Sequence, residues 1–367
     1  QFSARPMPMG DMAPQYTTIA LESGSVRASS ADETAILTPS QPSGREKARG
    51  HVAGPEGWSA WLEPKFPERF ISPTRLVLSG PAGRRLSCST PECEGILRMW
   101  WSDRERALFA VQKSGWGQAG MAILRWEAGA PEPRRLLEGD AMLLGCRHAV
   151  REIICGREDA TTPRRIVSVD SKTGSLRLIY DPNARVGTLS LGNAQRFRFH
   201  NAYGVESYAD LVLPPGHRPG QRHPLIVVQY ISHGFLRGGS GDEVPIQPLA
   251  ARGFAVLSVA SSNYIPAVTQ KYKTGTELLR ANRVDWLDQR SVQSSLDIAL
   301  DRAIATGAVD ADRIGLTGWS AGVSAAQFAL INSPRYKAVS LGSCCEDMYS
   351  FALEAGPAFS DFARSIG

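Results

Sequence analysis

A serine near the C-terminal end of the sequence has the neighbours of a catalytic nucleophile. The segment Gly318–Gly322 reads Gly-Trp-Ser-Ala-Gly, and it lies between an expected strand at 313–316 and an expected helix at 323–331. Small residues beside a serine permit the tight strand-to-helix turn that exposes its Oγ, and the helix N-terminus favours a developing oxyanion. The pattern predicts Ser320 as a nucleophile; the alternative is a glycine-rich turn without chemistry.

A second chemical segment follows the apolar run 224–230, where α/β-hydrolases place the loop that completes the oxyanion hole. Tyr230 ends this run and could donate its hydroxyl. We expect substrate-lining roles for four residues after it: His233, Gly234, Phe235 and Arg237. His233 is a weaker candidate for a general base, because the hydrolase fold delivers its histidine from a later loop. Arg237 could bind a carboxylate or carbonyl oxygen, or could pair with Asp242 or Glu243.

The elements that must position these residues change in type along the chain. Residues 1–72 are rich in Pro, Gly, Ser and Ala and form an N-terminal segment without readable strand patterns. From 73 to 190 short β runs alternate with turns, and the runs at 107–111 and 122–126 recur at 152–156 and 165–169. A repeat of about 40–50 residues with several strands is typical of β-propeller blades. We therefore expect part of a β-propeller domain, with a β-sandwich as the alternative.

Residues 191–367 have the pattern of the N-terminal part of an α/β-hydrolase domain, ending after the nucleophile elbow. A β-hairpin is expected around Gly204, and two apolar runs, 224–230 and 253–260, are typical of strands buried on both faces. A helical period lies between 285 and 307, and a further strand is expected at 337–341. Strands that alternate with helices predict a mostly parallel sheet with helices on both faces.

Composition excludes several classes of protein. The chain has 41 Lys+Arg and 36 Asp+Glu, a net charge of +5, and its basic residues are scattered, so we expect no nucleic-acid partner. No apolar run reaches the ~18–20 residues of a spanning helix, so no membrane span is expected. The cysteines lack zinc-ligand spacing, and we expect neither a metal nor a cofactor.

Four cysteines form two close pairs in the β-rich part: Cys88 with Cys93, and Cys146 with Cys155. Such pairs predict two local disulfides in an oxidising compartment. Together with a sequence that begins at Gln1 rather than Met, they predict a periplasmic or exported protein. Free buried thiols in a cytoplasmic protein are the alternative.

The same motifs resemble a known family. Asp312–Leu316 leading into Gly318–Gly322, after a propeller-like half, is similar to the prolyl oligopeptidase family of serine peptidases. Gly234–Gly239 and Gly241–Glu243, with the Cys88/Cys93 segment and Trp100-Trp101, resemble its lasso peptide isopeptidases. The resemblance implies a propeller over an α/β-hydrolase domain, Ser320 as the nucleophile, and an oxyanion hole from the Ala321 N–H and the Tyr230 hydroxyl. The implied reaction hydrolyses, through an acyl-enzyme, the isopeptide bond that closes the macrolactam ring of a lasso peptide.

The sequence departs from this family after the elbow. Asp347 and Asp361 follow Ser320, but no histidine does, so the triad Asp and His are not identifiable. The β-rich half also has room for only about four repeats of propeller-blade length. We therefore expect that the sequence is incomplete, either a fragment or joined pieces of a longer chain.

Three functions compete at this point. The first is a serine isopeptidase that opens lasso peptides. The second is a general prolyl-oligopeptidase-like or dipeptidyl-peptidase-like enzyme. The third is a non-catalytic pseudo-hydrolase that binds peptides, which requires that the protein truly lacks the histidine; the intact mass of the purified protein tests that condition. The oligomeric state is not predicted.

Overall fold

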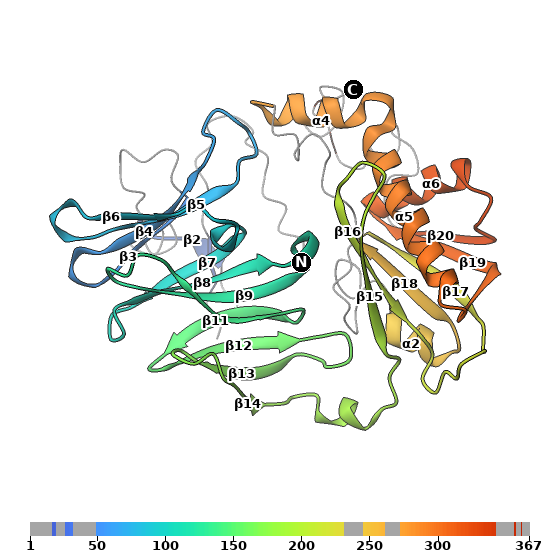
Figure 1. The fold of residues 1–367 in the computed structure, drawn as a ribbon, viewed down its shortest axis with the longest axis horizontal. Coiled ribbons are helices and arrows are strands. Elements are labelled where there is room, and N and C mark those ends of the chain that lie inside the picture. The colour runs from blue at the N-terminus through green and yellow to red at the C-terminus, as the bar shows by residue number, and fades with distance from the viewer. Residues whose placement is uncertain are drawn as a thin grey trace.

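The computed structural model describes residues 17–19, 26–31, 49–230, 245–260, 272–342, 356 and 361. These residues form a β-rich half and an α/β half that lie side by side (Figure 1). A short antiparallel pair, β1 (Thr17–Ile19) and β2 (Val26–Ala28), precedes both. Within the described ranges, no helix combines the length and the apolar composition that a membrane crossing requires.

The β-rich half contains three four-stranded antiparallel sheets, each connected in chain order. The first consists of β3 (Arg49–Ala53), β4 (Ser59–Pro64), β5 (Thr74–Ser79) and β6 (Arg85–Cys88). The second consists of β7 (Ile96–Ser102), β8 (Ala107–Ser114), β9 (Gly120–Glu127) and β10 (Arg134–Gly139). The third consists of β11 (Met142–Ala149), β12 (Glu152–Glu158), β13 (Arg165–Asp170) and β14 (Leu176–Tyr180). Successive four-stranded meanders of this kind are the units expected of propeller blades.

The sequence repeat corresponds to equivalent strands of successive sheets. The run 107–111 lies in β8 and its echo 152–156 in β12, while 122–126 lies in β9 and 165–169 in β13. The expected start of the β region at residue 73 differs from the structure, because β4 pairs with β5 from Ser59↔Ser79 to Pro64↔Thr74. The first sheet thus begins at Arg49. Prolines and glycines around β4 conceal this strand in the sequence.

The three sheets pack face to face through two apolar clusters. The first cluster joins the first and second sheets and includes Leu76, Leu78, Leu108, Leu124 and Trp126. The second joins the second and third sheets and includes Phe109, Val111, Ile123, Ile153 and Val169. Successive side chains of β8 and β9 point into different clusters, and both strands are buried along most of their length. The second sheet is therefore covered on both faces, as in a stack of blades.

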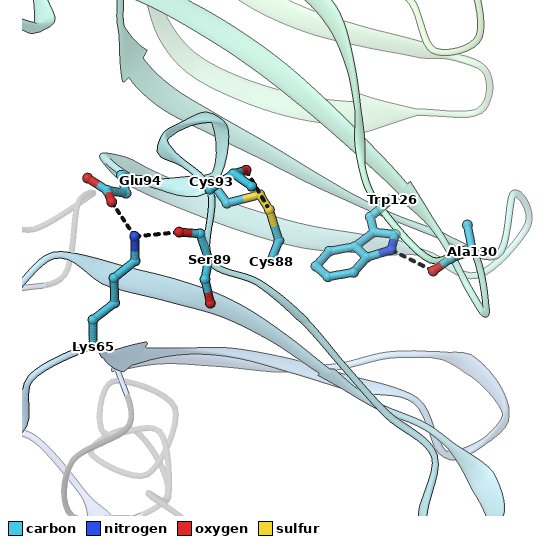
Figure 2. Close-up of a disulfide and its surroundings, with 8 residues drawn as sticks. Lys65, Cys88, Ser89, Cys93, Glu94, Trp126 and Ala130 are labelled. Atoms are coloured by element: carbon cyan, nitrogen blue, oxygen red, sulfur yellow. Dashed lines mark hydrogen bonds and ion pairs between the residues drawn. A yellow bond between two sulfur atoms is a disulfide. The ribbon is translucent and has the colours of Figure 1, made fainter.

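Both cysteine pairs are bonded in the structure. Cys88 at the end of β6 joins Cys93, with their Cα atoms 6.0 Å apart, beside a Lys65 ammonium that bonds Glu94 and the Ser89 carbonyl (Figure 2). Cys146 joins Cys155 across the neighbouring strands β11 and β12, with their Cα atoms 4.2 Å apart. The compartment inferred from these pairs stays a prediction.

The α/β half is built on one six-stranded sheet in the order β15-β16-β18-β17-β19-β20. Its strands are β15 (Ala194–His200), β16 (Glu206–Val212), β17 (His223–Tyr230), β18 (Ala255–Ala260), β19 (Val309–Trp319) and β20 (Ala338–Gly342). The last four are mutually parallel, and β15 and β16 form the expected hairpin, in which Gly204 takes a φ of 74°. Residue 191, the expected start of the hydrolase domain, lies between β14 and β15.

Helices cover both faces of this sheet, as the sequence pattern predicted. The helices are α2 (Ile246–Ala251), α4 (Gly275–Arg283), α5 (Leu287–Ala305) and α6 (Ala321–Asn332). Apolar residues of α5 and α6 share one core with Leu225 and Val227 of β17, whereas α2 packs on Val228 across the sheet. Short 3-10 turns connect other elements: η1 (Pro55–Gly57), η2 (Pro81–Gly83), η3 (Pro91–Cys93), η4 (Trp116–Gln118), η5 (Ala184–Thr188) and η6 (Val284–Trp286).

A buried charged cluster joins the second and third sheets. The Glu105 carboxylate, 6% exposed, pairs with the Arg125 guanidinium, 4% exposed. It also accepts hydrogen bonds from Ser171 Oγ at 2.6 Å and lies 2.8 Å from His148 Nε2. Burial alone would raise the pKa of Glu105, but the hydrogen bonds of Ser171, Arg125 and His148 together hold it below its ordinary value. The carboxylate therefore stays charged, and it neutralises Arg125.

We predict that Glu105→Gln destabilises the protein by about 3 kcal/mol, because it leaves the Arg125 charge buried without a counter-charge. Urea unfolding followed by tryptophan fluorescence measures the loss. Folding lowers the pKa of Glu105, so the difference from the unmodified protein should be full above pH 4.5 and shrink as pH falls through the lowered pKa.

The matched control for this prediction is Glu138→Gln, because Glu138 forms a half-exposed pair with Arg135. The control should cost less than about 1 kcal/mol, as exposed pairs do. Equal losses for the two variants would contradict the role given to the Glu105 cluster.

Candidate active site

Ser320 occupies a sharp turn between the last residue of β19 and the first residue of α6. Its backbone has φ 53° and ψ −121°, a positive-φ conformation that costs a non-glycine residue about 1–3 kcal/mol. The Val323 N–H donates to the Ser320 carbonyl at 2.8 Å, and the Ser320 N–H donates to the Gly342 carbonyl at 3.3 Å. Ser320 is half-buried and Ala321 is exposed. This is the geometry of a nucleophile elbow, in which strain holds the serine at a fixed place.

The two glycines of the motif permit backbone segments to approach closely. A Cβ on Gly318 would lie 2.2 Å from the Gly322 carbonyl oxygen, closer than atoms can come without a shift. A Cβ on Gly322 would lie 3.1 Å from Gln229 Cβ and 3.3 Å from the Gln229 carbonyl. Glycine is therefore required at 318 by the turn itself, and it is favoured at 322 because α6 begins directly against β17.

The end of β17 lies beside the elbow. Gln229 pairs with Gly318 across the parallel strands, so the Tyr230 backbone reaches the same edge of the sheet as Ser320. The side chain of Tyr230 lies outside what the structure describes, as do His233, Gly234, Phe235, Arg237 and Asp347. Their predicted roles in the oxyanion hole, in substrate contact and in the triad stay predictions. Asp361 is exposed, and its neighbours in the sequence lie outside the described residues.

Gln229 is a residue of this site that the sequence did not single out. Its side chain is 2% exposed, and among the described residues neither its Nε2 nor its Oε1 has a hydrogen-bond partner. Side chains alternate between the two faces of a strand, so Gln229 points to the same face of β17 as Leu225 and Val227. It therefore faces α5 and α6, directly under the elbow. An unsatisfied buried amide costs about 1–3 kcal/mol, and such costs concentrate at functional sites. In the sequence, Gln229 is concealed because it lies within the apolar run 224–230, next to Tyr230.

The β-rich half contacts the α/β half beside the hairpin of β15 and β16. Both β15 and β18 are antiparallel to β16, and β18 is parallel to β17. The C-terminal ends of β15 and β17, at His200 and Tyr230, therefore lie at the same edge of the sheet. At that edge Trp116 lies edge-on to His200, with ring centroids 4.7 Å apart, and its Nε1 donates to the Ser207 carbonyl at 2.9 Å. The Gly117 N–H donates to the Glu206 carboxylate at 2.8 Å.

A second contact between the two halves lies near α4. The Phe70 N–H donates to the Tyr272 carbonyl at 2.8 Å, and the Phe70 ring packs so closely on Gly275 that a Cβ there would lie 2.9 Å from it. The two halves also meet at Asp140, which pairs with Arg198 at 3.1 Å, so contacts with the β-rich half extend along β15.

The site is a serine elbow on a hydrolase-type sheet, and comparison with known proteins agrees with that class. No family model matches the chain. The chain is 34% identical over 364 residues to the lasso peptide isopeptidase AtxE2 of Asticcacaulis excentricus. The alignment covers 99% of this chain and 51% of the relative. The resemblance to lasso peptide isopeptidases expected from the motifs is thus confirmed. The chain spans about half the length of the relative that it matches.

Solved structures agree with the sequence comparison. An AtxE2 isopeptidase serine-to-alanine variant with Astexin3-dC4 bound matches with a TM-score of 0.84 and 32% identity, over 96% of this chain and 53% of that one. The apo form of AtxE2 matches with the same TM-score and 33% identity over the same shares. An acylaminoacyl peptidase of Pyrococcus horikoshii shares the fold at a TM-score of 0.53 and 18% identity, over 78% of this chain and 43% of that one. The chain thus has the architecture of these propeller and α/β-hydrolase proteins.

We predict that Gly318→Ala disrupts the elbow, because its Cβ meets backbone atoms that cannot rotate away. The loss should be at least about 2 kcal/mol in the free energy of unfolding, measured by urea denaturation. Gly315→Ala in the same strand is the control, since its Cβ would lie an ordinary 3.5 Å from the Ala338 carbonyl oxygen. A Gly318→Ala variant as stable as the Gly315→Ala variant would show that the turn is less tight than described.

Proposed function

We propose that this chain is part of a serine isopeptidase that hydrolyses the isopeptide bond closing the macrolactam ring of a lasso peptide. The observation that carries the proposal is the strained Ser320 elbow at the end of β19. The similarity of almost the whole chain to a lasso peptide isopeptidase supports the reaction and the substrate class.

The proposed chemistry proceeds through an acyl-enzyme. Ser320 Oγ attacks the side-chain amide carbonyl of the ring-closing Asp or Glu of the peptide, and the oxyanion is held by the Ala321 N–H at the start of α6 and by the Tyr230 hydroxyl. The bond to the peptide's N-terminal nitrogen breaks, and the amine leaves with a proton. Water then cleaves the ester, which releases the side-chain carboxylate and restores the hydroxyl. A histidine must accept the Ser320 proton, and this residue is not identified in the sequence.

The arrangement of the two halves favours a bulky substrate. The ring of a lasso peptide is locked around its own tail, so the scissile bond must arrive as part of a folded object. Contacts around Trp116 and around Phe70 join the β-rich half to the hairpin of β15 and β16 and to the chain next to α4. We infer that the substrate binds between these contacts, with the loop 232–243 as one wall and Ser320 at the floor.

A general oligopeptidase is the second candidate function. The chain shares its fold with an acylaminoacyl peptidase, and one fold can carry several functions. A peptide-binding pseudo-hydrolase is a third candidate if the purified protein lacks a base. Its intact mass and a hydrolysis assay separate these possibilities from the proposal.

We predict that Ser320→Ala abolishes ring opening and leaves the fold intact, because alanine fits the same turn. Loss of a triad nucleophile can cost on the order of 10⁶ in rate. Mass spectrometry detects the reaction as a gain of one water by the lasso peptide. Ser324→Ala, one turn further along α6, is the control and should hydrolyse at the unmodified rate. Ring opening by the Ser320→Ala variant near that rate would exclude Ser320 as the nucleophile.

We predict that the enzyme distinguishes a threaded lasso from its unthreaded, branched-cyclic isomer of identical sequence. Recognition of the folded ring should give the threaded form at least about tenfold higher kcat/KM, which corresponds to ~1.4 kcal/mol of differential binding. Parallel time courses by liquid chromatography and mass spectrometry provide the ratio. Equal rates for both isomers would favour the general oligopeptidase.

A further inference from the structure

A cavity of about 420 Å³ lies in the β-rich half, away from Ser320. It is formed by the C-terminal end of β7, the turn after it and the C-terminal end of β11. Its walls include Arg98, Trp100, Trp101, Arg104, Arg147 and His148. The volume suits a few residues of a peptide and is within the usual range of small-ligand pockets.

Strand register places this cavity at the end of the blades opposite the α/β half. Ser102, at the cavity end of β7, pairs with Ala107 at the start of β8, and the other end of β8 leads to Trp116, which contacts the α/β half. In the third sheet, Asp140 pairs with Arg198 of the α/β half at 3.1 Å. Strand β11 begins next to Asp140 and runs from there to the cavity. The cavity is therefore a site separate from the elbow.

The cavity has an excess of uncompensated positive charge. Arg98, Arg104 and Arg147 line it, and none of them forms an ion pair in the part of the chain that the structure describes. The acidic residue in its lining is Asp103. Other arginines of the same sheets are paired, for example Arg177 with Glu152 at 2.8 Å.

The buried charges under the cavity add nothing to this balance. The Glu105 carboxylate is neutralised by Arg125, and its second oxygen is occupied by Ser171 and His148. His148 in turn stacks on Phe109, at 5.0 Å between ring centroids. The three lining arginines therefore face an incoming anion without competition from Glu105.

Two indoles, those of Trp100 and Trp101, add flat apolar surface to the cavity wall. The Nε1 atoms of both indoles are buried, and no residue that the structure describes accepts a hydrogen bond from them. Trp100 stacks on Phe109 at 6.2 Å, so its ring orientation is fixed. Guanidinium groups beside indole faces suit a ligand that joins a carboxylate to an apolar or aromatic group.

We propose that this arginine pocket binds the carboxylate of a peptide, supplied by a C-terminus or by an acidic side chain next to an aromatic residue. The choice of a peptide as the ligand rests on the proposed function; the binding itself does not involve Ser320. A peptide held here by a carboxylate occupies the end of the blades opposite the catalytic edge.

Isothermal titration calorimetry at low salt tests the proposal on the full chain. The ligands are acetyl-Gly-Phe with a free C-terminus, acetyl-Glu-Phe-amide and acetyl-Gly-Phe-amide, which separate the two carboxylate sources from a neutral reference. At least one of the two carboxylate peptides should bind about tenfold more tightly than the neutral amide. The Arg98→Ala/Arg147→Ala variant should lose that difference, whereas the Arg177→Ala variant, which removes an arginine elsewhere in the third sheet, should retain it.

The proposal would be overturned by equal affinity for all three peptides, including no binding of any. It would also be overturned if the Arg177→Ala variant lost the difference between the peptides as the double variant does. Tighter binding of AMP than of the carboxylate peptides would indicate a nucleotide site instead. Circular dichroism checks the fold of the double variant, and the comparison of peptides on the unmodified protein decides the question even if that variant misfolds. Because no hydrolysis is measured, this outcome is independent of isopeptide cleavage, which the Ser320→Ala assay tests separately.

Discussion

The close approach of β17, β19 and α6 at one edge of the six-stranded sheet determines where the chemistry can take place. The Gly322 backbone lies against Gln229, and the Gly318 position leaves no room for a side chain. Within that confinement Ser320 keeps a backbone conformation that it would not adopt alone. The fold therefore supports the strain at the elbow, and the hydrogen bond from the Ser320 N–H to the Gly342 carbonyl of β20 adds to this support.

The β-rich half depends on the same edge for its place. Trp116 and Gly117 bond the hairpin between β15 and β16, whose tip lies at the catalytic edge, and Phe70 contacts the chain next to α4. These contacts, together with the pair of Asp140 and Arg198, join the blades to the α/β half. In the proposed function the substrate would reach Ser320 between the two halves, and its shape would contribute to selection.

Local patterns in the sequence predicted much of this arrangement. The strand–Ser320–helix unit and the repeat that relates β8 to β12 are local in sequence, and both occur where expected. Strand β4 was missed because prolines and glycines flank it and its partners lie on neighbouring strands. Gln229 and the arginine pocket depend on contacts between segments far apart in the chain, for which a single sequence carries no local signal.

The most direct test of the central claim is covalent labelling of the nucleophile with a fluorophosphonate, followed by mapping of the adduct by mass spectrometry. We expect one adduct, on the peptide that contains Ser320, and slower labelling in the presence of a threaded lasso peptide. The elbow geometry predicts this selectivity, because it is Ser320 that combines an exposed strand-to-helix turn with the N-terminus of α6. An adduct on another residue, or labelling that the lasso peptide does not slow, would contradict the account.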